Sequence, residues 1–309
     1  MHGMSRLLFT AVVLALGVLV VPTGAFADGD VDAQLADAMD AINAALAADG
    51  ADYRAAMAEY LSVDGEDHAN TVIAKDVGNK QLSTDFVPND TRRAWSAPFG
   101  GPFDDITYAI DTTGDAVPVF GGLTAAQTDA AIVRAMSSWD ALTCSHLPIV
   151  RNPDFGLDIG VVAFIVSGGA VGSPFVFGDV QHAGWRDLNF AGGILGVTFT
   201  FIFIDGAGNG TDVDGDGRID TAFREIYYDP SFSWADDGVT NIDVETVALH
   251  EAGHGLSQAH FGMVFFDNNG NLKFAPHAVM NAVYAAPQRT LLGTDEGGHC
   301  SNWASWPNN

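Results

Sequence analysis

Residues 250–254 read His250-Glu251-Ala252-Gly253-His254, and the apolar run Val247-Ala248-Leu249 precedes them. Because one helical turn is about four residues, the two histidines project from one face of a helix and can share a metal ion. Glu251 lies one position along, where its carboxylate can reach a water molecule on the metal rather than the metal itself. The apolar run is typical of a helix that is buried behind a site.

A third histidine, His260, follows beyond the end of this motif. The helix has to end after His254 so that the chain can turn and bring a third imidazole to the same metal, and Ser257 lies where that break is needed. Catalytic zinc takes three protein ligands and a water molecule, and it lowers the pKa of that water towards about 7. The pattern therefore predicts a zinc site formed by His250, His254 and His260, with Glu251 as the general base that activates the zinc-bound water.

The stretch from His250 to His260 resembles the long zinc motif of the metzincin peptidases, H-E-x-x-H-x-x-G-x-x-H. Metzincins also have a methionine turn beneath the metal, and Ala278-Val279-Met280-Asn281 resembles it, with Met280 as the Met-turn residue. Within the metzincins the chain most resembles the matrixins, from about Asp104 to the C-terminus. The resemblance implies an α+β catalytic domain with a mixed twisted sheet, an active-site helix and a Met-turn.

Further positions extend or limit this resemblance. The run from Gly192 to Phe199 resembles the edge strand that pairs with a bound peptide in the family, and Asp295 resembles the aspartate that opens the last helix. The family's glycine within the motif is Ser257 here, and a serine with positive φ costs about 1 kcal/mol. We expect Tyr284 to line the substrate pocket. His277 either lines the active-site cleft or packs against neighbouring residues, and the sequence does not decide between these two roles.

The N-terminus is typical of a secretory signal peptide over residues 1–27. Arg6 supplies the positive charge, Leu7 to Val21 is an apolar run too short for a membrane span, and Ala25-Phe26-Ala27 fits a cleavage site. The alternative is an uncleaved anchor. We expect a secreted, extracellular protein that begins near Asp28.

Residues 28–103 form a predicted N-terminal helical segment before the peptidase-like domain at 104–309. Leu35, Met39, Ile42 and Leu46 recur at helical spacing, and a second short helix is expected from Tyr53 to Leu61. The segment is interpreted as a possible propeptide, with a permanent part of the protein as the alternative. It contains no cysteine, so the cysteine-switch latency of the matrixins cannot operate in its usual form.

The region after Asp104 mixes strand and helix patterns, which favours an α+β or α/β arrangement with a mixed sheet. The expected strands are Ile106–Ile110, Gly160–Val166, Gly193–Ile204 and Arg224–Tyr228. One helix is expected from a Thr124 cap through Trp139, and the helix with the histidines is expected to start at Asn241.

A separate acidic stretch, residues 212–220, resembles the first part of a calcium-binding loop. Aspartates recur at alternate positions, and Gly217 can supply the sharp turn of such a loop. Phe223 occupies the last position, where a glutamate is usual. The predicted calcium positions are Asp212, Asp214, Asp216, Arg218 and Asp220. The alternative is a solvated acidic turn.

Charge and cysteine content limit the compartment and the partners. With 39 acidic and 13 basic residues, the net charge of −26 repels phosphate backbones and anionic lipids, so we expect no nucleic acid and, after signal removal, no membrane partner. The two cysteines, Cys144 and Cys300, are expected to pair in an exported chain, the alternative being two separate buried thiols.

These observations together predict a secreted zinc-dependent endopeptidase that acts on protein or peptide substrates, with Zn²⁺ as cofactor and Ca²⁺ as a structural ion. The alternative functions are a catalytically inactive secreted module that binds zinc and calcium, and a zinc hydrolase for small substrates. Glu251 argues against the inactive module, because a glutamate at this position serves the chemistry rather than the holding of zinc.

Overall fold

The computed structural model describes residues 31–63, 70–74, 76–77, 84–93, 104–187 and 193–308. The predicted signal peptide, residues 1–27, lies outside these residues, so its removal stays a prediction. Within the part of the chain that is described, no helix combines the length and the hydropathy that a membrane span needs.

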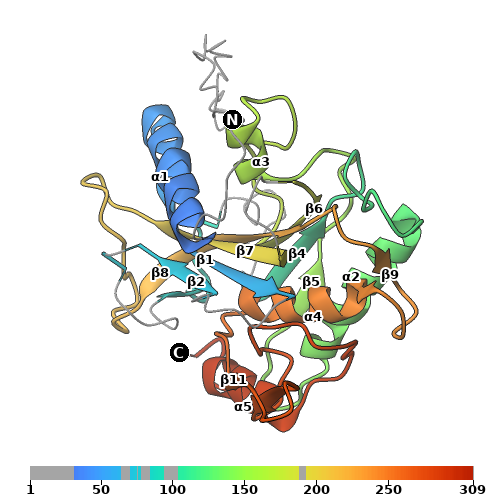
Figure 1. The fold of residues 1–309 in the computed structure, drawn as a ribbon. Coiled ribbons are helices and arrows are strands. Elements are labelled where there is room, and N and C mark those ends of the chain that lie inside the picture. The colour runs from blue at the N-terminus through green and yellow to red at the C-terminus, as the bar shows by residue number, and fades with distance from the viewer. Residues whose placement is uncertain are drawn as a thin grey trace.

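Eight of the described strands form one mixed sheet, in the order β2-β1-β7-β8-β6-β4-β5 with β3 beside β8 (Figure 1). They are β1 (Tyr53–Ser62), β2 (Thr71–Ile73), β3 (Thr84–Asp85), β4 (Ile106–Ile110), β5 (Ile149–Arg151), β6 (Val180–Trp185), β7 (Ile194–Phe203) and β8 (Ile219–Tyr228). Strands β4, β5, β6 and β8 are parallel, whereas β7 is antiparallel to β8 and to β1. The prediction of an α+β fold with a mixed sheet is confirmed at this level.

Two short strand pairs lie outside this sheet. One joins β9 (Trp234–Ala235) to β10 (Ile242–Asp243), just before the helix with the histidines. The other is a hairpin of β11 (Met263–Phe266) and β12 (Leu272–Ala275), which carries the exposed loop after His260.

Helices cover both faces of the sheet (Figure 1). On one face α1 (Val31–Asp49) and α3 (Val161–Val166) pack against apolar side chains of β1, β7 and β8. On the other face α2 (Ala125–Asp140) packs with α4 (Val244–Gly255), and α5 (Gly293–Trp303) lies beyond them. Each face thus has its own hydrophobic core.

The predicted helix that starts at Thr124 is confirmed as α2. The Thr124 hydroxyl accepts the Gln127 N–H at 3.3 Å, and the Gln127 side-chain oxygen accepts the Thr124 N–H at 3.0 Å, so the helix begins with a reciprocal cap. At its other end the buried Trp139 indole N–H donates to the Leu249 carbonyl oxygen at 3.0 Å. This bond joins α2 to α4.

The prediction of a second short helix from Tyr53 to Leu61 is wrong, because these residues form β1. Its alanines favour a helix, but propensity is a weak prior that tertiary contacts override. β1 pairs with β7 along its length and with β2 on its other side, and the residues from Ala55 to Ser62 are buried. Pairing on two sides and burial decide the outcome here.

The pairing of β1 with β7 joins the N-terminal segment to the main sheet. β1 and β2 precede Phe103, yet they belong to the sheet that β4 to β8 form. The helix α1 also packs on this sheet through Leu35, Met39 and Ile42. In the described residues the segment before Phe103 is therefore not a structurally separate unit, and its removal as a propeptide stays a prediction.

The strand predicted for Gly160–Val166 is also wrong, because Val161–Val166 forms α3. The buried Glu225 carboxylate accepts the N–H groups of Val161 and Val162, each at 2.8 Å. A carboxylate that satisfies two N–H groups at a helix N-terminus stabilises a helical start. The β-branched sequence favours a strand, but this long-range contact outweighs it.

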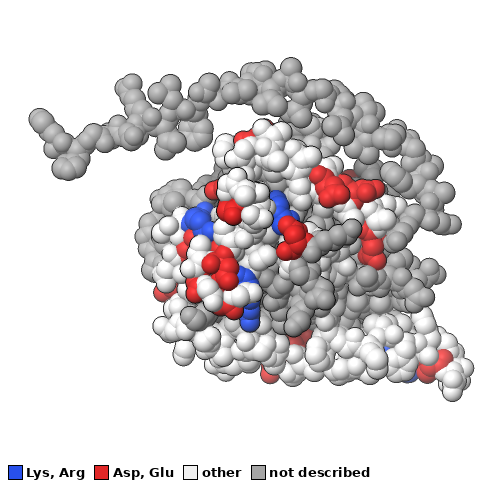
Figure 2. All heavy atoms as spheres, turned by 90° about the vertical axis from the view of Figure 1, so that its left-hand side faces the viewer, with Lys and Arg blue, Asp and Glu red and all other residues white. Residues whose placement is uncertain are grey.

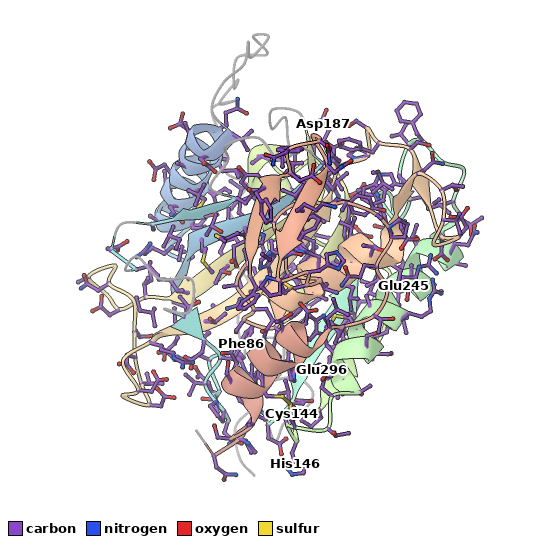
Figure 3. All side chains as sticks on the ribbon, turned by 60° about the horizontal axis from the view of Figure 1, so that its bottom comes forward. Phe86, Cys144, His146, Asp187, Glu245 and Glu296 are labelled. Carbon is purple, nitrogen blue, oxygen red and sulfur yellow. A yellow bond between two sulfur atoms is a disulfide. The ribbon has the colours of Figure 1, made fainter. Side chains whose placement is uncertain are left out.

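The predicted Cys144–Cys300 disulfide is confirmed, with the two Cα atoms 5.6 Å apart. It ties the loop after α2 to α5, and Figure 3 shows Cys144 beside that helix. On the face of the molecule in Figure 2, acidic side chains outnumber basic ones, in keeping with the net charge of −26.

Candidate metal centre

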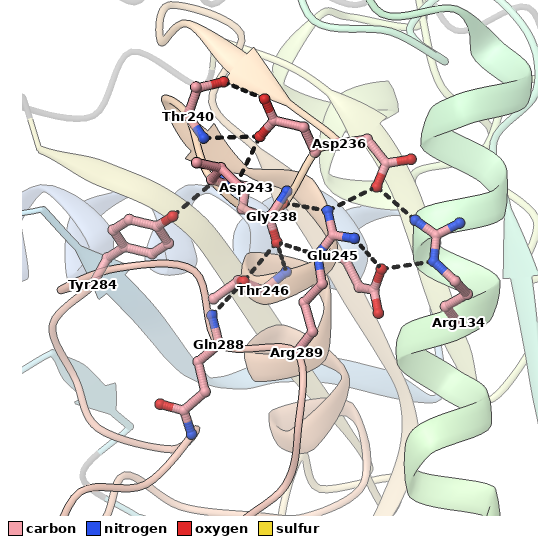
Figure 4. Close-up of polar contacts among 12 residues, drawn as sticks. Arg134, Asp236, Gly238, Thr240, Asp243, Glu245, Thr246, Tyr284, Gln288 and Arg289 are labelled. Carbon is pink, nitrogen blue, oxygen red and sulfur yellow. Dashed lines mark hydrogen bonds and ion pairs between the residues drawn. The ribbon is translucent and has the colours of Figure 1, made fainter.

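A network of charged groups fixes the start of α4 (Figure 4). The helix begins at Val244 rather than at the predicted Asn241, and its N-cap Asp243 accepts the Thr246 N–H at 2.9 Å. Burial raises the pKa of Asp243, but hydrogen bonds from Arg289 and Thr246 outweigh burial and hold that pKa below its ordinary value. The Arg289 Nε–H donates to Asp243 at 3.0 Å. The helix that carries the predicted ligands is therefore anchored at its first turn.

The three predicted zinc ligands meet at one point. The Nε2 atom of His254 lies 3.0 Å from Nε2 of His250 and 3.1 Å from Nε2 of His260. His250 and His254 come from consecutive turns of α4 and are 1% and 0% exposed. His260 arrives from the chain beyond the helix. Sequence reasoning thus named three residues that the fold brings together.

The turn that returns His260 to the helix starts at the end of α4. The Ser257 N–H donates to the His254 carbonyl oxygen at 3.0 Å, and the Gln258 N–H donates to the Gly253 carbonyl oxygen at 2.8 Å. Ser257 has a φ of 63°, in the left-handed region. The serine therefore adopts the conformation that the motif requires of a glycine, at a cost of about 1–2 kcal/mol.

The Nδ1 atoms of His250 and His254 make the hydrogen bonds that are expected of metal-binding histidines. His250 Nδ1 lies 2.7 Å from the Val279 carbonyl oxygen, and His254 Nδ1 lies 2.8 Å from that of Gln258. A carbonyl oxygen only accepts, so both Nδ1 atoms donate and both Nε2 atoms carry lone pairs. Burial lowers the pKa of all three rings, including His260, which keeps them neutral.

The distances between the histidine Nε2 atoms fit a bound Zn²⁺ ion. A tetrahedral Zn²⁺ with Zn–N bonds of about 2.0–2.1 Å separates its ligand nitrogens by roughly 3.3 Å. The separations of 3.0 and 3.1 Å are close to that value. Three neutral imidazoles that turn lone pairs to a shared point repel one another unless a cation lies between them, so the residues fit zinc.

The carboxylate of Glu251 lies between α4 and β7. Its Oε2 accepts the Thr198 hydroxyl at 2.7 Å, while Oε1 has no partner among the described residues. Burial raises the pKa of Glu251 well above its ordinary value, and the Thr198 hydroxyl and the Leu61 backbone N–H lower it. A Cβ on Gly196 would come within 2.7 Å of Oε1, so only a glycine there lets β7 pass so close.

The predicted Met-turn residue packs directly against α4. Met280 is 2% exposed, and a Cβ on Gly253 would lie 2.3 Å from its sulfur. Asp295, in the first turn of α5 as expected, accepts the N–H groups of Val279 at 3.0 Å and Met280 at 3.1 Å. The Val279 carbonyl oxygen also contacts Nδ1 of His250. The turn therefore helps to hold the ring of this candidate metal ligand in place.

A pocket opens beside His250. It is lined by α4, by the segment after Met280 and by β1, and its walls include Leu61, Val283, His277 and Tyr284. Tyr284 therefore lines the pocket as expected, and His277 lies in the cleft rather than in a packed interior.

Sequence reasoning missed Glu59 and Thr71. Glu59 of β1 is 2% exposed, and its Oε2 lies 3.4 Å from His254 Nδ1. Burial raises the pKa of Glu59 to about 8, against the lowering effect of Arg224. The Thr71 hydroxyl of β2 lies 3.3 Å from His260 Nδ1. No local pattern marks either residue, because only the pairing of β1 with β7 brings them to the histidines.

The acidic loop between β7 and β8 is assembled only in part. Carboxylate oxygens of Asp212, Asp214 and Asp220 lie within 4.8 Å of one another. Asp216 and Arg218, also predicted, are not in this group, and Arg218 Nε pairs with Asp216 at 3.6 Å. Three of the predicted positions could therefore share a cation.

No family model matches this chain, and no curated protein matches it. Its function therefore has to be argued from the geometry of its own residues.

Proposed function

We propose that the protein is a secreted zinc-dependent endopeptidase of metzincin type, similar to the matrixins. The observation that carries the proposal is the convergence of three histidine Nε2 atoms beside Glu251, which has one carboxylate oxygen free of partners among the described residues. When bound there, Zn²⁺ supplies a Lewis acid that polarises a carbonyl group and lowers the pKa of water towards about 7.

The chain's own residues supply the remaining chemistry. Glu251 takes a proton from the attacking water and passes it to the leaving nitrogen. Thr198 holds one carboxylate oxygen, which leaves the other without a partner among the described residues and available for proton transfer. The pocket beside His250 can receive a substrate side chain. The prediction that β7 is an edge strand is wrong, because β1 and β8 pair with it on both sides, so an extended protein or peptide substrate would pair with β7 only where β1 is displaced.

We also propose Ca²⁺ as a structural ion at Asp212, Asp214 and Asp220. Asp220 is already paired with Arg92 at 2.7 Å. A bound ion would therefore chiefly balance the charges of Asp212 and Asp214, and it would fix the loop that leads into β8. The proposal gives calcium no part in the chemistry.

Glu251→Gln tests the proposed activity. The variant should retain about one zinc per chain, because all three histidines remain, and should lose hydrolysis of an unfolded protein by roughly 10²–10⁴-fold. Glu296→Gln, the same change at an exposed position of α5, is the matched control and should keep full activity. His254→Ala should lose the zinc. Normal turnover by Glu251→Gln would refute the mechanism. A zinc-loaded wild-type protein that hydrolyses nothing would favour the alternative, a catalytically inactive module that binds zinc.

A further inference from the structure

The edge of β7, where an extended substrate could pair, is occupied by the protein's own β1. β1 runs antiparallel to β7 from Tyr53 to Ser62. In this register Leu61 lies opposite Gly196, the glycine that packs against Glu251. The backbone of β1 therefore passes directly over the proposed general base.

The other side of the same strand is held by the segment after the methionine turn. The Ser62 N–H donates to the Ala282 carbonyl oxygen at 3.2 Å, and the Tyr284 N–H donates to the Ser62 carbonyl oxygen at 2.7 Å. Ser62 and Val283 form a parallel bridge. The chain at Leu61–Ser62 is thus an extended strand clamped between β7 and the wall of the pocket.

Leu61 occupies the position of a substrate residue in three respects. Its side chain is 2% exposed and lines the pocket beside His250. It packs in one apolar cluster with Val279 and Met280 of the turn that supports the metal site. The N–H groups of Tyr60 and Ser62 both point away from β7, to the carbonyl oxygens of Asn70 and Ala282, so the Leu61 N–H between them points towards β7 and the Glu251 side. The nitrogen of the Tyr60–Leu61 peptide bond is therefore the one that Glu251 can protonate.

The carbonyl group of this peptide bond points away from β7, towards β2. The Tyr60 carbonyl oxygen accepts the Asn70 side-chain N–H at 3.2 Å, next to β2. β2 is also the strand whose Thr71 hydroxyl contacts His260. The nitrogen and the carbonyl oxygen of this peptide bond thus point to opposite sides of β1, the first towards β7 and Glu251 and the second towards β2, the strand that contacts His260.

We propose that the Tyr60–Leu61 bond is the enzyme's own first substrate, cut within the same chain; this rests on the function proposed above. Water adds across the bond: its oxygen joins the Tyr60 carbonyl carbon, and the C–N bond breaks. Glu251 carries one proton from the water to the Leu61 nitrogen, so the products are a Tyr60 carboxylate and a free Leu61 amine. Until this cut, β1 fills the groove and excludes other peptides, which gives latency without a cysteine.

The test follows the intact, zinc-loaded chain by denaturing mass spectrometry and N-terminal sequencing. Denaturing conditions are needed because α1 packs on the sheet through Leu35 and Met39 and would keep the two pieces together. We expect a new N-terminus at Leu61, formed at a rate that does not change with protein concentration. Glu251→Gln should stay uncut. A cut at another bond, or a rate proportional to concentration, would overturn the proposal.

Variants at Leu61 separate this inference from the proposed function. Leu61→Asp should slow the cut by on the order of 100-fold or more, because the apolar pocket rejects a carboxylate. It should also open the groove, so an added unstructured protein is digested without a lag. Leu61→Met, of similar volume, should still be cut, and the zinc content of each variant reports its folding.

The possible failures are distinguishable. If the wild-type chain or Leu61→Asp digests the added protein while the Tyr60–Leu61 bond of the wild-type chain stays intact, the self-cleavage is refuted and the endopeptidase stands. If no zinc-loaded variant cuts either the added protein or its own chain, the endopeptidase itself is refuted.

Discussion

Replacing Ser257 by glycine should stabilise the protein, because two unfavourable features meet at this residue. Its φ of 63° places an L-side chain in the left-handed region. Its hydroxyl is buried, and Oγ has no hydrogen-bond partner among the described residues. Both features follow from the turn that brings His260 back to α4.

The two contributions can be separated with two variants. Ser257→Ala removes only the unpaired hydroxyl and should raise the free energy of unfolding by about 1 kcal/mol. Ser257→Gly also relieves the backbone, which favours the folded state by about 1–2 kcal/mol. The greater freedom of glycine in the unfolded chain opposes this by about 0.4–1 kcal/mol. The free energy of unfolding of Ser257→Gly should therefore exceed that of Ser257→Ala by roughly 0.5–1 kcal/mol.

Urea unfolding of zinc-saturated Glu251→Gln protein measures these differences without self-digestion. Saturation matters because zinc binds the folded state and would otherwise mix binding with folding. In thermal unfolding, the Ser257→Gly variant should melt about 3–8 °C above the parent, at about 2–4 °C per kcal/mol. If Ser257→Gly were no more stable than Ser257→Ala, the assignment of backbone strain to this position would be wrong.

Two further predictions concern the disulfide and calcium. Replacing both Cys144 and Cys300 by serine should destabilise the protein by about 5 kcal/mol on the chain-entropy argument, since the bond closes a loop of 156 residues; the urea midpoint checks this, and an unchanged midpoint would contradict it. Calcium should raise the melting temperature, and Asp212→Ala combined with Asp214→Ala should abolish that response while zinc content stays constant. A calcium response that survives in the double variant would place the ion elsewhere.

The convergence of the three histidines was predictable because the residues that produce it lie close together in the sequence. His250, Glu251 and His254 are fixed by one helical turn, and His260 needs only a chain reversal at Ser257. The strand Ile106–Ile110 and the helix capped by Thr124 were predictable for the same reason. In each case the residues that determine the structure lie within a few positions of one another.

The errors at β1 and α3 have the opposite cause. Val161–Val166 is helical because Glu225, far along the chain, accepts the N–H groups at its start. The stretch from Tyr53 to Ser62 is a strand because β7 and β2 pair with it on both sides. Neither partner is visible in the local pattern, which favours a strand in the first case and a helix in the second.

The conformation of residues 53–62 also determines what lies beside β7 and the histidines. If Tyr53–Leu61 were a helix, the side of β7 that faces away from β8 would have no partner strand. With the same residues as a strand, the edge is filled, Leu61 enters the pocket and Glu59 reaches His254. A local motif can therefore specify the chemistry, but the state of the groove depends on strand pairing between distant segments. That is why the first substrate could be proposed only from the fold.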